Sequence, residues 1–240
     1  MAGCRTQSVL IPDAPLYNRG MSKNVEFQRS SSETINYEAA KFLRDTQRTV
    51  GMMHVPSEID AAVDILLHTN GKIITTGMGK AGHIAQKCAS SLCSLSFPAV
   101  YLHPGDAAHG DIGIIKSYNA GCPELGSKAD TLIAFSTSGK TREVLETIKF
   151  SRALGIWKVI TITSHSVSPV KRVSDVVLDM GRIGEAGHLG LAPTTSAVIM
   201  MIVADMLALV AAKMKDVTKE DYGARHHGGY LGRKCRGETR

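Results

Sequence analysis

Short apolar runs alternate with amphipathic stretches through the middle of the chain. The runs have the length and β-branched content of buried strands, and they cover residues 72–76, 99–102, 131–135, 158–163 and 175–180. Between them, residues 81–95 and 141–154 carry apolar side chains at helical spacing, and a shorter stretch lies near Val170. This alternation predicts an α/β fold, a three-layer parallel sheet of about five strands with helices on both faces, of the flavodoxin- or Rossmann-like kind.

Helical patterns also flank this region. Residues 33–50 form one, and Ser57 has the character of an N-cap for a second over residues 58–68. Pro193 is suited to the first turn of a long apolar helix that ends near Lys213, and residues 219–224 predict a short final helix. We expect a flexible N-terminal arm over residues 1–32, a single domain over 33–234, a surface loop over 116–128 and a C-terminal tail over 235–240.

The composition narrows the class of partner. The chain has 240 residues, of which 5% are aromatic, and a formal net charge of +6. So few aromatic residues argue against nucleic-acid binding by base stacking, and a mildly basic surface suits a small anionic substrate. The five cysteines form no C-x-x-C pair, and no run reaches the ~20 apolar residues of a membrane span. We therefore expect a cytoplasmic protein without a nucleic-acid or membrane partner.

Gly77, Gly79 and Gly82 spell G-x-G-x-x-G after the first strand, the pattern of a dinucleotide-binding turn. That interpretation needs an acidic residue at the end of the second strand, where this chain has His103, Pro104 and Gly105. The triphosphate-binding P-loop is absent as well, because Lys80 is followed by alanine. The glycines instead indicate a tight turn that lets the backbone approach another kind of ligand.

A second loop, residues 136–141, follows the third strand and begins a helix. It holds three hydroxyl side chains and a glycine, as Ser136, Thr137, Ser138 and Gly139, before Thr141. Backbone N–H groups and the helix dipole at such a position favour an anion, and the hydroxyls add donors. Because both loops follow strands of one parallel sheet, they should share its carboxyl edge, which makes the second loop a candidate phosphate site.

Five runs in order resemble the sugar-isomerase (SIS) domain of arabinose-5-phosphate isomerases. They are GMGKAGH at 77, HPGDAAHGDIG at 103, STSGKTRE at 136, EAGHLGLAPTTS at 185 and HHGGYLGRK at 226. The resemblance covers residues 33–234 and implies a short form that lacks the regulatory CBS domains. Lys140 stands where many members carry glutamate, and His227 replaces a proline, which leaves the exact substrate preference open.

The resemblance implies an aldose–ketose isomerase that interconverts D-arabinose 5-phosphate and D-ribulose 5-phosphate, the entry to 3-deoxy-D-manno-octulosonate (Kdo) in lipopolysaccharide and capsule. It implies catalytic roles for Lys80, His109, Glu143, Glu185 and His226. It also implies substrate binding by Gly79, Ser96, Ser136, Thr137, Ser138, Gly139 and Thr141. No cofactor is required, although a zinc contact at His103 is implied. His226 would reach a neighbouring subunit within a homotetramer.

The residue types fit this chemistry. Moving a carbonyl between C1 and C2 needs one group to remove a proton beside the carbonyl and one to return a proton to the adjacent carbon, which carboxylates and imidazoles do without a metal. Lys80 could stabilise the enediolate oxygen, and His226 with Glu143 or Glu185 could share the acid/base work. Each residue alone also suits a structural role. Two alternatives stay open: a sugar-phosphate-binding module without catalysis, and an isomerase of another sugar phosphate.

Overall fold

The computed structural model describes residues 31–115 and 129–238. The expected loop at 116–128, and all of the expected arm but its last two residues, lie outside the described residues. Internal contacts divide the chain into two units, Met1–Ala39 and Ala40–Arg240. Helix α1, Ser31–Gly51, begins in the first unit and ends in the second, as the pattern over residues 33–50 predicts. The features described below all belong to the second unit.

Five parallel strands form one sheet in the order β2-β1-β3-β4-β5. Their bounds are β1 Ile73–Gly77, β2 Ala99–Tyr101, β3 Thr131–Phe135, β4 Lys158–Thr163 and β5 Val176–Asp179. Gly77 pairs with Phe135, and Phe135 pairs with Ile162, so three strands end at one level. This is the strand order of flavodoxin-like sheets, and it confirms the predicted fold class.

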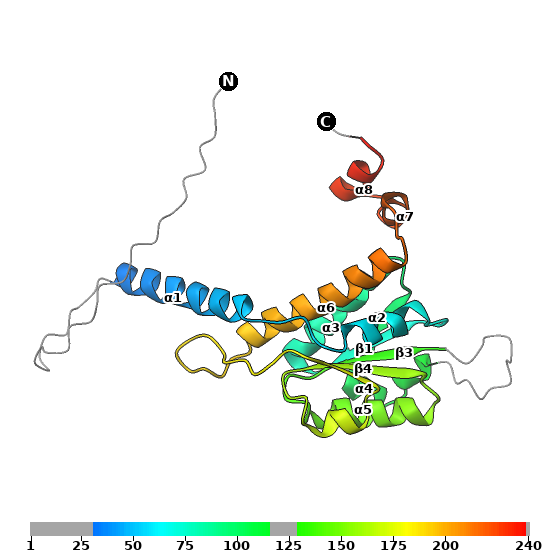
Figure 1. Cartoon of the computed structure of the whole chain (residues 1–240), viewed down its shortest axis with the longest axis horizontal. Helices are drawn as coiled ribbons and strands as arrows, with labels where there is room; N and C mark the ends of the chain where they lie inside the picture. Colours follow the sequence, from blue (N-terminus) through cyan, green and yellow to red (C-terminus); the bar gives the residue numbers. More distant parts are fainter. Residues whose placement is uncertain (1–30, 116–128, 239–240) are drawn as a thin grey trace, which may run out of the picture. The chain divides into compact units, whose positions relative to one another are not determined.

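Helices cover both faces of the sheet (Figure 1). Strands β1 and β3 are buried along their whole length, because alternate residues point to opposite apolar layers. One layer contains Ile73, Ile133 and Phe135 with α2 (Ile59–Leu67), α3 (Gly79–Ser94) and α6 (Thr195–Met214). The other contains Ile74, Leu132 and Ala134 with α4 (Pro104–Ala107), α5 (Arg142–Ala153) and the short 3-10 helices Asp111–Ile114 and Pro169–Arg172.

Two predicted helix starts are wrong. The N-cap of α2 is Glu58 rather than Ser57, and the Glu58 carboxylate accepts a hydrogen bond from the backbone of Val177 at 3.1 Å. Helix α6 begins at Thr195, so Pro193 precedes the helix and is not part of its first turn. The carboxylate of Glu185, which lies outside the helix, accepts hydrogen bonds from backbone N–H groups at the start of α6. Local pattern could not reveal either tertiary contact.

The C-terminal region forms two short helices (Figure 1). Helix α7, Lys219–Gly223, agrees with the predicted segment, and a capping box between Thr218 and Asp221 starts it. Helix α8, Gly229–Cys235, was not expected, because its two glycines hide the helical pattern. It packs closely against the chain before it, since a Cβ at Gly232 would lie 1.9 Å from the carbonyl oxygen of His226.

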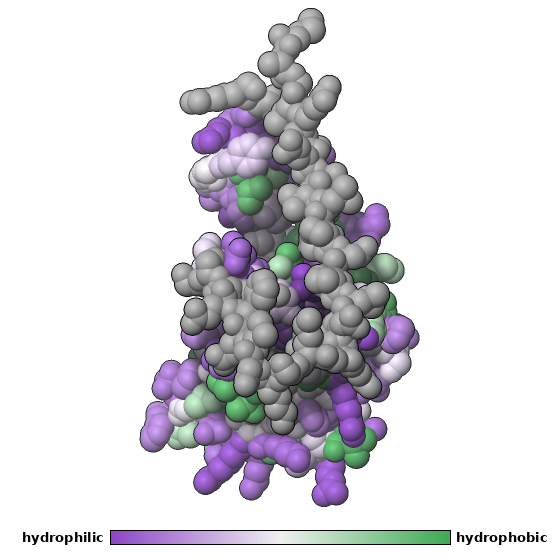
Figure 2. Space-filling view, turned by 90° about the vertical axis from the view of Figure 1, so that its left-hand side faces the viewer, coloured by the Kyte–Doolittle hydropathy of each residue, from purple (hydrophilic) through white to green (hydrophobic). Residues whose placement is uncertain are grey.

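Among the described helices, α6 has the length and apolar composition that a membrane crossing needs. It packs against α2, α3 and β4, and 56% of its most apolar window is buried in the protein. A core helix of a folded domain has the same properties, so α6 is weak evidence for a membrane span. On the face shown in Figure 2, apolar side chains of the described residues occur in small separate areas among hydrophilic ones.

Candidate active site

The reversal of strand order creates a crevice between β1 and β3. From β1 the chain continues to β2 on one side, and β3 then pairs on the other side of β1. Open α/β sheets bind ligands at such a point, beyond the carboxyl ends of the strands. Helix α3 begins directly after β1 and α5 begins shortly after β3, on opposite faces of the sheet. Both predicted ligand-binding loops therefore lie at this edge, on neighbouring strands ~4.8 Å apart.

Each glycine of the first loop has a separate steric reason. Gly79 has a φ of +57°, which L side chains rarely adopt. A Cβ at Gly82 would lie 2.5 Å from the carbonyl oxygen of Gly77 and 2.8 Å from the Tyr101 hydroxyl. That hydroxyl donates a hydrogen bond to the same Gly77 oxygen at 2.8 Å. The turn is therefore held from β2, and its close approach excludes side chains.

Hydrogen bonds within the second loop, residues 136–141, close it on itself. The hydroxyls of Ser136 and Thr141 lie 2.9 Å apart, and the backbone N–H of Gly139 donates to the Ser136 hydroxyl at 3.1 Å. Gly139 has a φ of +62°, and a Cβ there would lie 2.0 Å from the Ser168 hydroxyl. Ser168 was not among the predicted site residues. Its role depends on a contact across the fold that the local sequence does not indicate.

The end of β4 anchors the middle of this loop. The carbonyl oxygen of Thr137 accepts hydrogen bonds from the Ser164 backbone at 3.1 Å and from the Ser164 hydroxyl at 2.9 Å. The hydroxyl of Thr163 donates to the same oxygen at 3.1 Å. Because the Thr137 carbonyl oxygen is hydrogen-bonded to the end of β4, the loop has a fixed geometry before any ligand binds.

The N-terminus of α5 remains free for an anion. Thr141 is its N-cap, and among the described residues no side chain caps this helix. The Thr141 hydroxyl faces Ser136 instead. The first N–H groups of a helix lack partners within the helix and carry its positive dipole end, so α5 presents donors and positive potential beside Ser138, which is exposed.

Four predicted residues lie at this edge of the sheet. Lys80 is the second residue of α3 and is exposed, and Glu143 is in the first turn of α5 and partly buried. His103 and His109 follow β2, where the His103 ring stands edge-on to Tyr101 with 6.4 Å between ring centroids. Burial raises the pKa of Tyr101, and the charge of Asp106 adds to the effect, so the phenol stays a hydrogen-bond donor.

Glu185 lies in the segment between β5 and α6 and acts on the start of α6. Its Oε2 accepts hydrogen bonds from the backbone of Thr194 at 2.9 Å and of Ser196 at 3.1 Å. Burial alone would raise the pKa of this carboxyl, but the hydrogen bonds from Ser196 and Thr194 outweigh it and hold the pKa below its usual value. Glu185 is therefore an ionised carboxylate that caps a helix.

His226 and Ser96 lie at the opposite end of α3 from Lys80. The His226 Nε2 is 3.4 Å from the hydroxyl of Ser94, the last residue of α3, and Ser96 follows two residues later. Fourteen residues of helix separate Lys80 from Ser94, which corresponds to ~21 Å at 1.5 Å per residue. One chain therefore does not bring His226 or Ser96 together with Lys80, and their roles in catalysis and binding stay predictions.

Tyr222 holds the ring of His226. The two rings stack with centroids 4.0 Å apart and 14° between their planes, and the His226 Nδ1 lies 2.8 Å from the Tyr222 carbonyl oxygen. Tyr222 was not among the predicted site residues. Local helical spacing does not reveal this contact, because α7 ends at Gly223 and His226 lies in the chain after it.

A zinc contact at His103 has little support from its neighbours. The His103 Nδ1 lies 3.5 Å from an oxygen of Asp106, and both side chains are exposed. Within residues 31–115 and 129–238, no group of three or more His, Cys, Asp or Glu side chains could hold a metal ion. The described residues of one chain therefore do not supply the three or four protein ligands that structural and catalytic zinc sites use, and the zinc contact stays a prediction.

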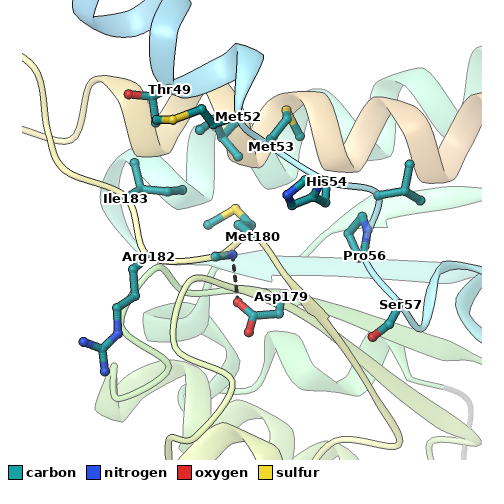
Figure 3. Close-up of a pocket in the computed structure, with 13 residues that line it drawn as sticks. Thr49, Met52, Met53, His54, Pro56, Ser57, Asp179, Met180, Arg182 and Ile183 are labelled. Atoms are coloured by element: carbon teal, nitrogen blue, oxygen red, sulfur yellow. Dashed lines mark hydrogen bonds between the residues drawn. The ribbon is translucent and has the colours of Figure 1, made fainter.

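A separate pocket of about 330 Å³ lies between residues 49–57 and the segment after β5 (Figure 3). Met52, Met53, Met180 and Ile183 line it, and a hydrogen bond of 2.9 Å from Gly181 to Asp179 fixes its floor. The Arg182 guanidinium points away from the methionines (Figure 3). None of the predicted site residues lines this pocket, and its apolar wall does not suit a phosphorylated sugar.

Comparison with known proteins agrees with this architecture. Residues 66–210 match the SIS domain family. The arabinose 5-phosphate isomerase KdsD of Pseudomonas aeruginosa is 33% identical over 214 residues, which cover 89% of this chain and 60% of that protein. The protein of the same name from Escherichia coli K12 is 35% identical over 181 residues, 75% of this chain and 52% of its own. The chain thus spans little more than half the length of the curated relatives it matches.

Two solved structures match over their full length. A candidate phosphosugar isomerase of Bacteroides fragilis, described as involved in capsule formation, is 37% identical with a TM-score of 0.72, and the match covers 84% of this chain and all of that one. An Escherichia coli CFT073 protein in complex with arabinose 5-phosphate is 28% identical with a TM-score of 0.73, and the match covers 82% of this chain and all of that one. By its sheet order and by the match of residues 66–210, the chain belongs to the SIS domain family.

Proposed function

We propose that this protein is an aldose–ketose isomerase that interconverts D-arabinose 5-phosphate and D-ribulose 5-phosphate, the step that leads to Kdo. The observation that carries the proposal is the pair of loops at the ends of β1 and β3. The loop of residues 136–141 and the uncapped start of α5 suit a phosphate, and the glycine turn with Lys80 lies beside them. Curated relatives named arabinose 5-phosphate isomerase, and the relative solved with arabinose 5-phosphate, support this substrate.

In the proposed reaction the phosphate binds at the N-terminus of α5, with the hydroxyls of Ser138 and Thr141 as further donors. A base removes the proton from C2 of the aldose while the C1 carbonyl oxygen takes up a proton, which gives an enediol. The O2 hydroxyl then loses its proton as C1 gains one, and the ketose is complete. The ammonium group of Lys80 stabilises the oxygen that carries negative charge in between.

Of the two glutamates, Glu143 is better suited to proton transfer. It lies in the first turn of α5, next to the proposed phosphate. The Oε2 of Glu185 accepts hydrogen bonds from the start of α6, and the lowered pKa of this carboxyl makes it a weak base. We therefore assign the acid/base work to Glu143 and His226, and a positioning role to Glu185. His109 follows β2 at the same edge and is proposed to contact the sugar hydroxyls.

His226 requires a second subunit in this proposal. Because it lies ~21 Å along α3 from Lys80, it acts on the site of a neighbouring chain in an oligomer. Ser96 lines the same pocket of about 540 Å³ as Arg225 and His227, at the His226 end of α3, so it would join the site from the neighbour too. We propose the cytoplasm as the compartment, in which the free thiols of Cys88, Cys93 and Cys235 would stay reduced.

The test is an NMR assay in D₂O with purified full-length protein and a panel of pentose and hexose phosphates. Interconversion of arabinose 5-phosphate and ribulose 5-phosphate, with solvent deuterium at the carbon that regains a proton, is the expected result. If a different sugar phosphate is turned over instead, that compound becomes the assigned substrate. Binding of arabinose 5-phosphate by calorimetry without turnover would instead favour a sugar-phosphate-binding module.

A further inference from the structure

The segment that follows β4 runs along the proposed phosphate loop. The hydroxyl of Ser164 donates to the carbonyl oxygen of Thr137 at 2.9 Å, and the backbone N–H of Val170 donates to the carbonyl oxygen of Gly139 at 3.2 Å. Residues 164–170 are therefore held against residues 137–139 at both ends. Side chains of this segment that face the loop are placed to contact an anion bound there.

One polar group of this segment is buried without a partner. Ser168 is only 9% exposed, and its hydroxyl has no hydrogen-bond partner among the described residues. The hydroxyl lies against Gly139, since a Cβ there would be 2.0 Å from the Ser168 oxygen. A buried hydroxyl that stays unpaired is costly, so this one points to an acceptor that a ligand at the loop supplies.

His165 presents an exposed imidazole ring to the same loop. Its Nδ1 lies 3.0 Å from the carbonyl oxygen of Thr137, which can only accept, so Nδ1 carries a proton. Within the described parts of the chain, the contacts of this ring with Thr137 and Ser164 both use Nδ1, so Nε2 is left for solvent or a ligand. The contact with Thr137 thus fixes which nitrogen a ligand can reach.

Protonation changes only the free nitrogen of His165. In the neutral ring Nε2 is an acceptor, which repels the oxygens of a phosphate dianion, whereas in the imidazolium ring it is a positively charged donor. Nδ1 donates to Thr137 in both forms, so the ring keeps its place when it gains the proton. A dianion bound beside the ring therefore favours the imidazolium form, through a charge-assisted hydrogen bond.

The charged groups of the neighbouring elements also favour an anion. They are Lys140 in the loop, Arg142 and Glu143 at the start of α5, Lys171 and Arg172 in the 3-10 helix Pro169–Arg172, Asp179 at the end of β5, and Arg182 after it. Arg142 pairs with Glu146 at 2.8 Å. Among the described residues of these elements, cations outnumber carboxylates even when this pair is set aside, so an anion beside His165 meets a net positive surrounding.

We propose that His165 is a further phosphate-binding residue, which acts in its imidazolium form and makes the affinity of this site for phosphate depend on pH. The Nε2–H group donates to a phosphate oxygen, beside the free N–H groups at the start of α5. The affinity rises as the pH falls and the ring takes up its proton. The position of the ring stands on the hydrogen bond to Thr137, whereas the identity of the anion as a sugar phosphate rests on the proposed function.

Calorimetry of the full-length chain with inorganic sulfate tests this role. Sulfate stays a dianion throughout the range from pH 6 to pH 8.5, so any proton taken up on binding goes to the protein. Titrations in two buffers of different ionisation enthalpy measure that uptake. For the wild type we expect proton uptake on binding, and a Kd roughly 10-fold lower at pH 6 than at pH 8.5, as a charge-assisted hydrogen bond allows.

His165→Asn is the matched variant, because its amide can still donate to the Thr137 carbonyl but cannot take up a proton. Its Kd should equal that of the wild type at pH 8.5 and be roughly 10-fold higher at pH 6, with the proton uptake lost. His68→Asn is the control and should behave as the wild type. His68 is also exposed, with Nδ1 2.9 Å from the Asp64 carbonyl oxygen, but it lies before β1, at the other edge of the sheet.

Equal proton uptake and equal Kd at pH 6 in His165→Asn and the wild type would overturn the role of His165. A Kd raised by the same factor at both pH values would overturn it too, because the ring would then hold the loop without binding as a cation. A wild type that binds neither sulfate nor inorganic phosphate would remove the phosphate site together with this role. If the wild type lacks isomerase activity but His165→Asn loses the sulfate-linked proton uptake, the proposed function fails and the role of His165 stands.

Discussion

The His226 ring stacks on the Tyr222 ring and is hydrogen-bonded to the Tyr222 backbone. The ring nitrogen Nδ1 lies 2.8 Å from the Tyr222 carbonyl oxygen, which can only accept, so Nδ1 carries the proton. In a neutral imidazole the other nitrogen, Nε2, is then the acceptor, and it faces Ser94. The structure thus supplies a histidine whose tautomer and ring plane are set in advance, as a group that accepts a proton requires.

Removing the Tyr222 ring should therefore impair turnover more than substrate binding. For Tyr222→Ala we expect kcat to fall roughly 10- to 100-fold with little change in KM, because a loosely held base loses its alignment. Tyr222→Phe keeps the stacked ring and should retain near-wild-type kcat. Steady-state kinetics with arabinose 5-phosphate measures both values. Equal losses in the two variants would mean that the ring does not position His226.

Glu143 and Glu146 offer a matched pair on α5. Glu143 is in the first turn, whereas Glu146, one turn later, pairs with Arg142 at 2.8 Å. Glu143→Gln should lower kcat by roughly 10²- to 10⁴-fold, the usual contribution of a general acid or base. Glu146→Gln should leave kcat within about twofold, since an exposed ion pair contributes little. Near-wild-type turnover of Glu143→Gln would remove this residue from the mechanism.

Alanine substitutions at Gly139 and Gly181 distinguish the effect of altering the phosphate loop from the effect of backbone strain alone. Both have positive φ, +62° and +76°, but a Cβ at Gly139 would meet Ser168, whereas a Cβ at Gly181 has nothing within 4 Å. Alanine at either position should cost roughly 1–3 kcal/mol of unfolding free energy through strain. Only Gly139→Ala should also raise the Kd for inorganic phosphate, because the loop must shift. Calorimetry and urea unfolding give the two quantities.

The sequence was sufficient for the sheet and its loops because these depend on local pattern. Strands buried on both faces are continuous apolar runs in the sequence. The glycines at 77, 79 and 82 indicate a tight turn whatever the path of the chain after it. The positions of Lys80, His103, His109 and Glu143 at one edge of the sheet follow from parallel strands alone, and their catalytic and binding roles stay predictions.

Contacts between distant segments could not be predicted in the same way. The Glu185 carboxylate accepts a hydrogen bond from the backbone of Thr194, nine positions later in the sequence. The segment between them is irregular, so the local sequence pattern does not predict this contact. The separation of Lys80 from His226 depends on the path of the chain after α6, which returns to the far end of α3. Lys215 shows this path, since its ammonium group bonds to the Ser96 carbonyl at 2.8 Å.

The described cysteines should differ in reactivity. Burial raises the pKa of Cys88 to about 12, and the nearby charge of Asp205 adds to the effect, so its thiolate is scarce at neutral pH. Cys93, five residues later on α3, is exposed. Iodoacetamide labelling read by peptide mass spectrometry should modify Cys93 in the native protein and Cys88 only after denaturation. Early labelling of Cys88 would mean that α3 opens readily.

Glu185 should make part of the stability depend on pH. Its pKa is lowered on folding from a usual value near 4.5, so the native state binds this proton less readily than the unfolded state. The stabilisation is therefore complete above that value and is lost as the pH falls through the native pKa. Glu185→Gln removes the anion at the start of α6 and should cost about 1 kcal/mol at pH 7.

The difference in unfolding free energy between wild type and Glu185→Gln should shrink as the pH falls below about 4.5 and vanish once the native carboxyl is protonated. Urea unfolding at pH 7, 5, 4 and 3 measures it. Glu146→Gln, at a half-exposed position on α5, is the control and should show a difference within about 0.5 kcal/mol at pH 7. A Glu185→Gln deficit that persists undiminished in acid would mean that packing, and not the charge at the start of α6, is what the substitution disturbs.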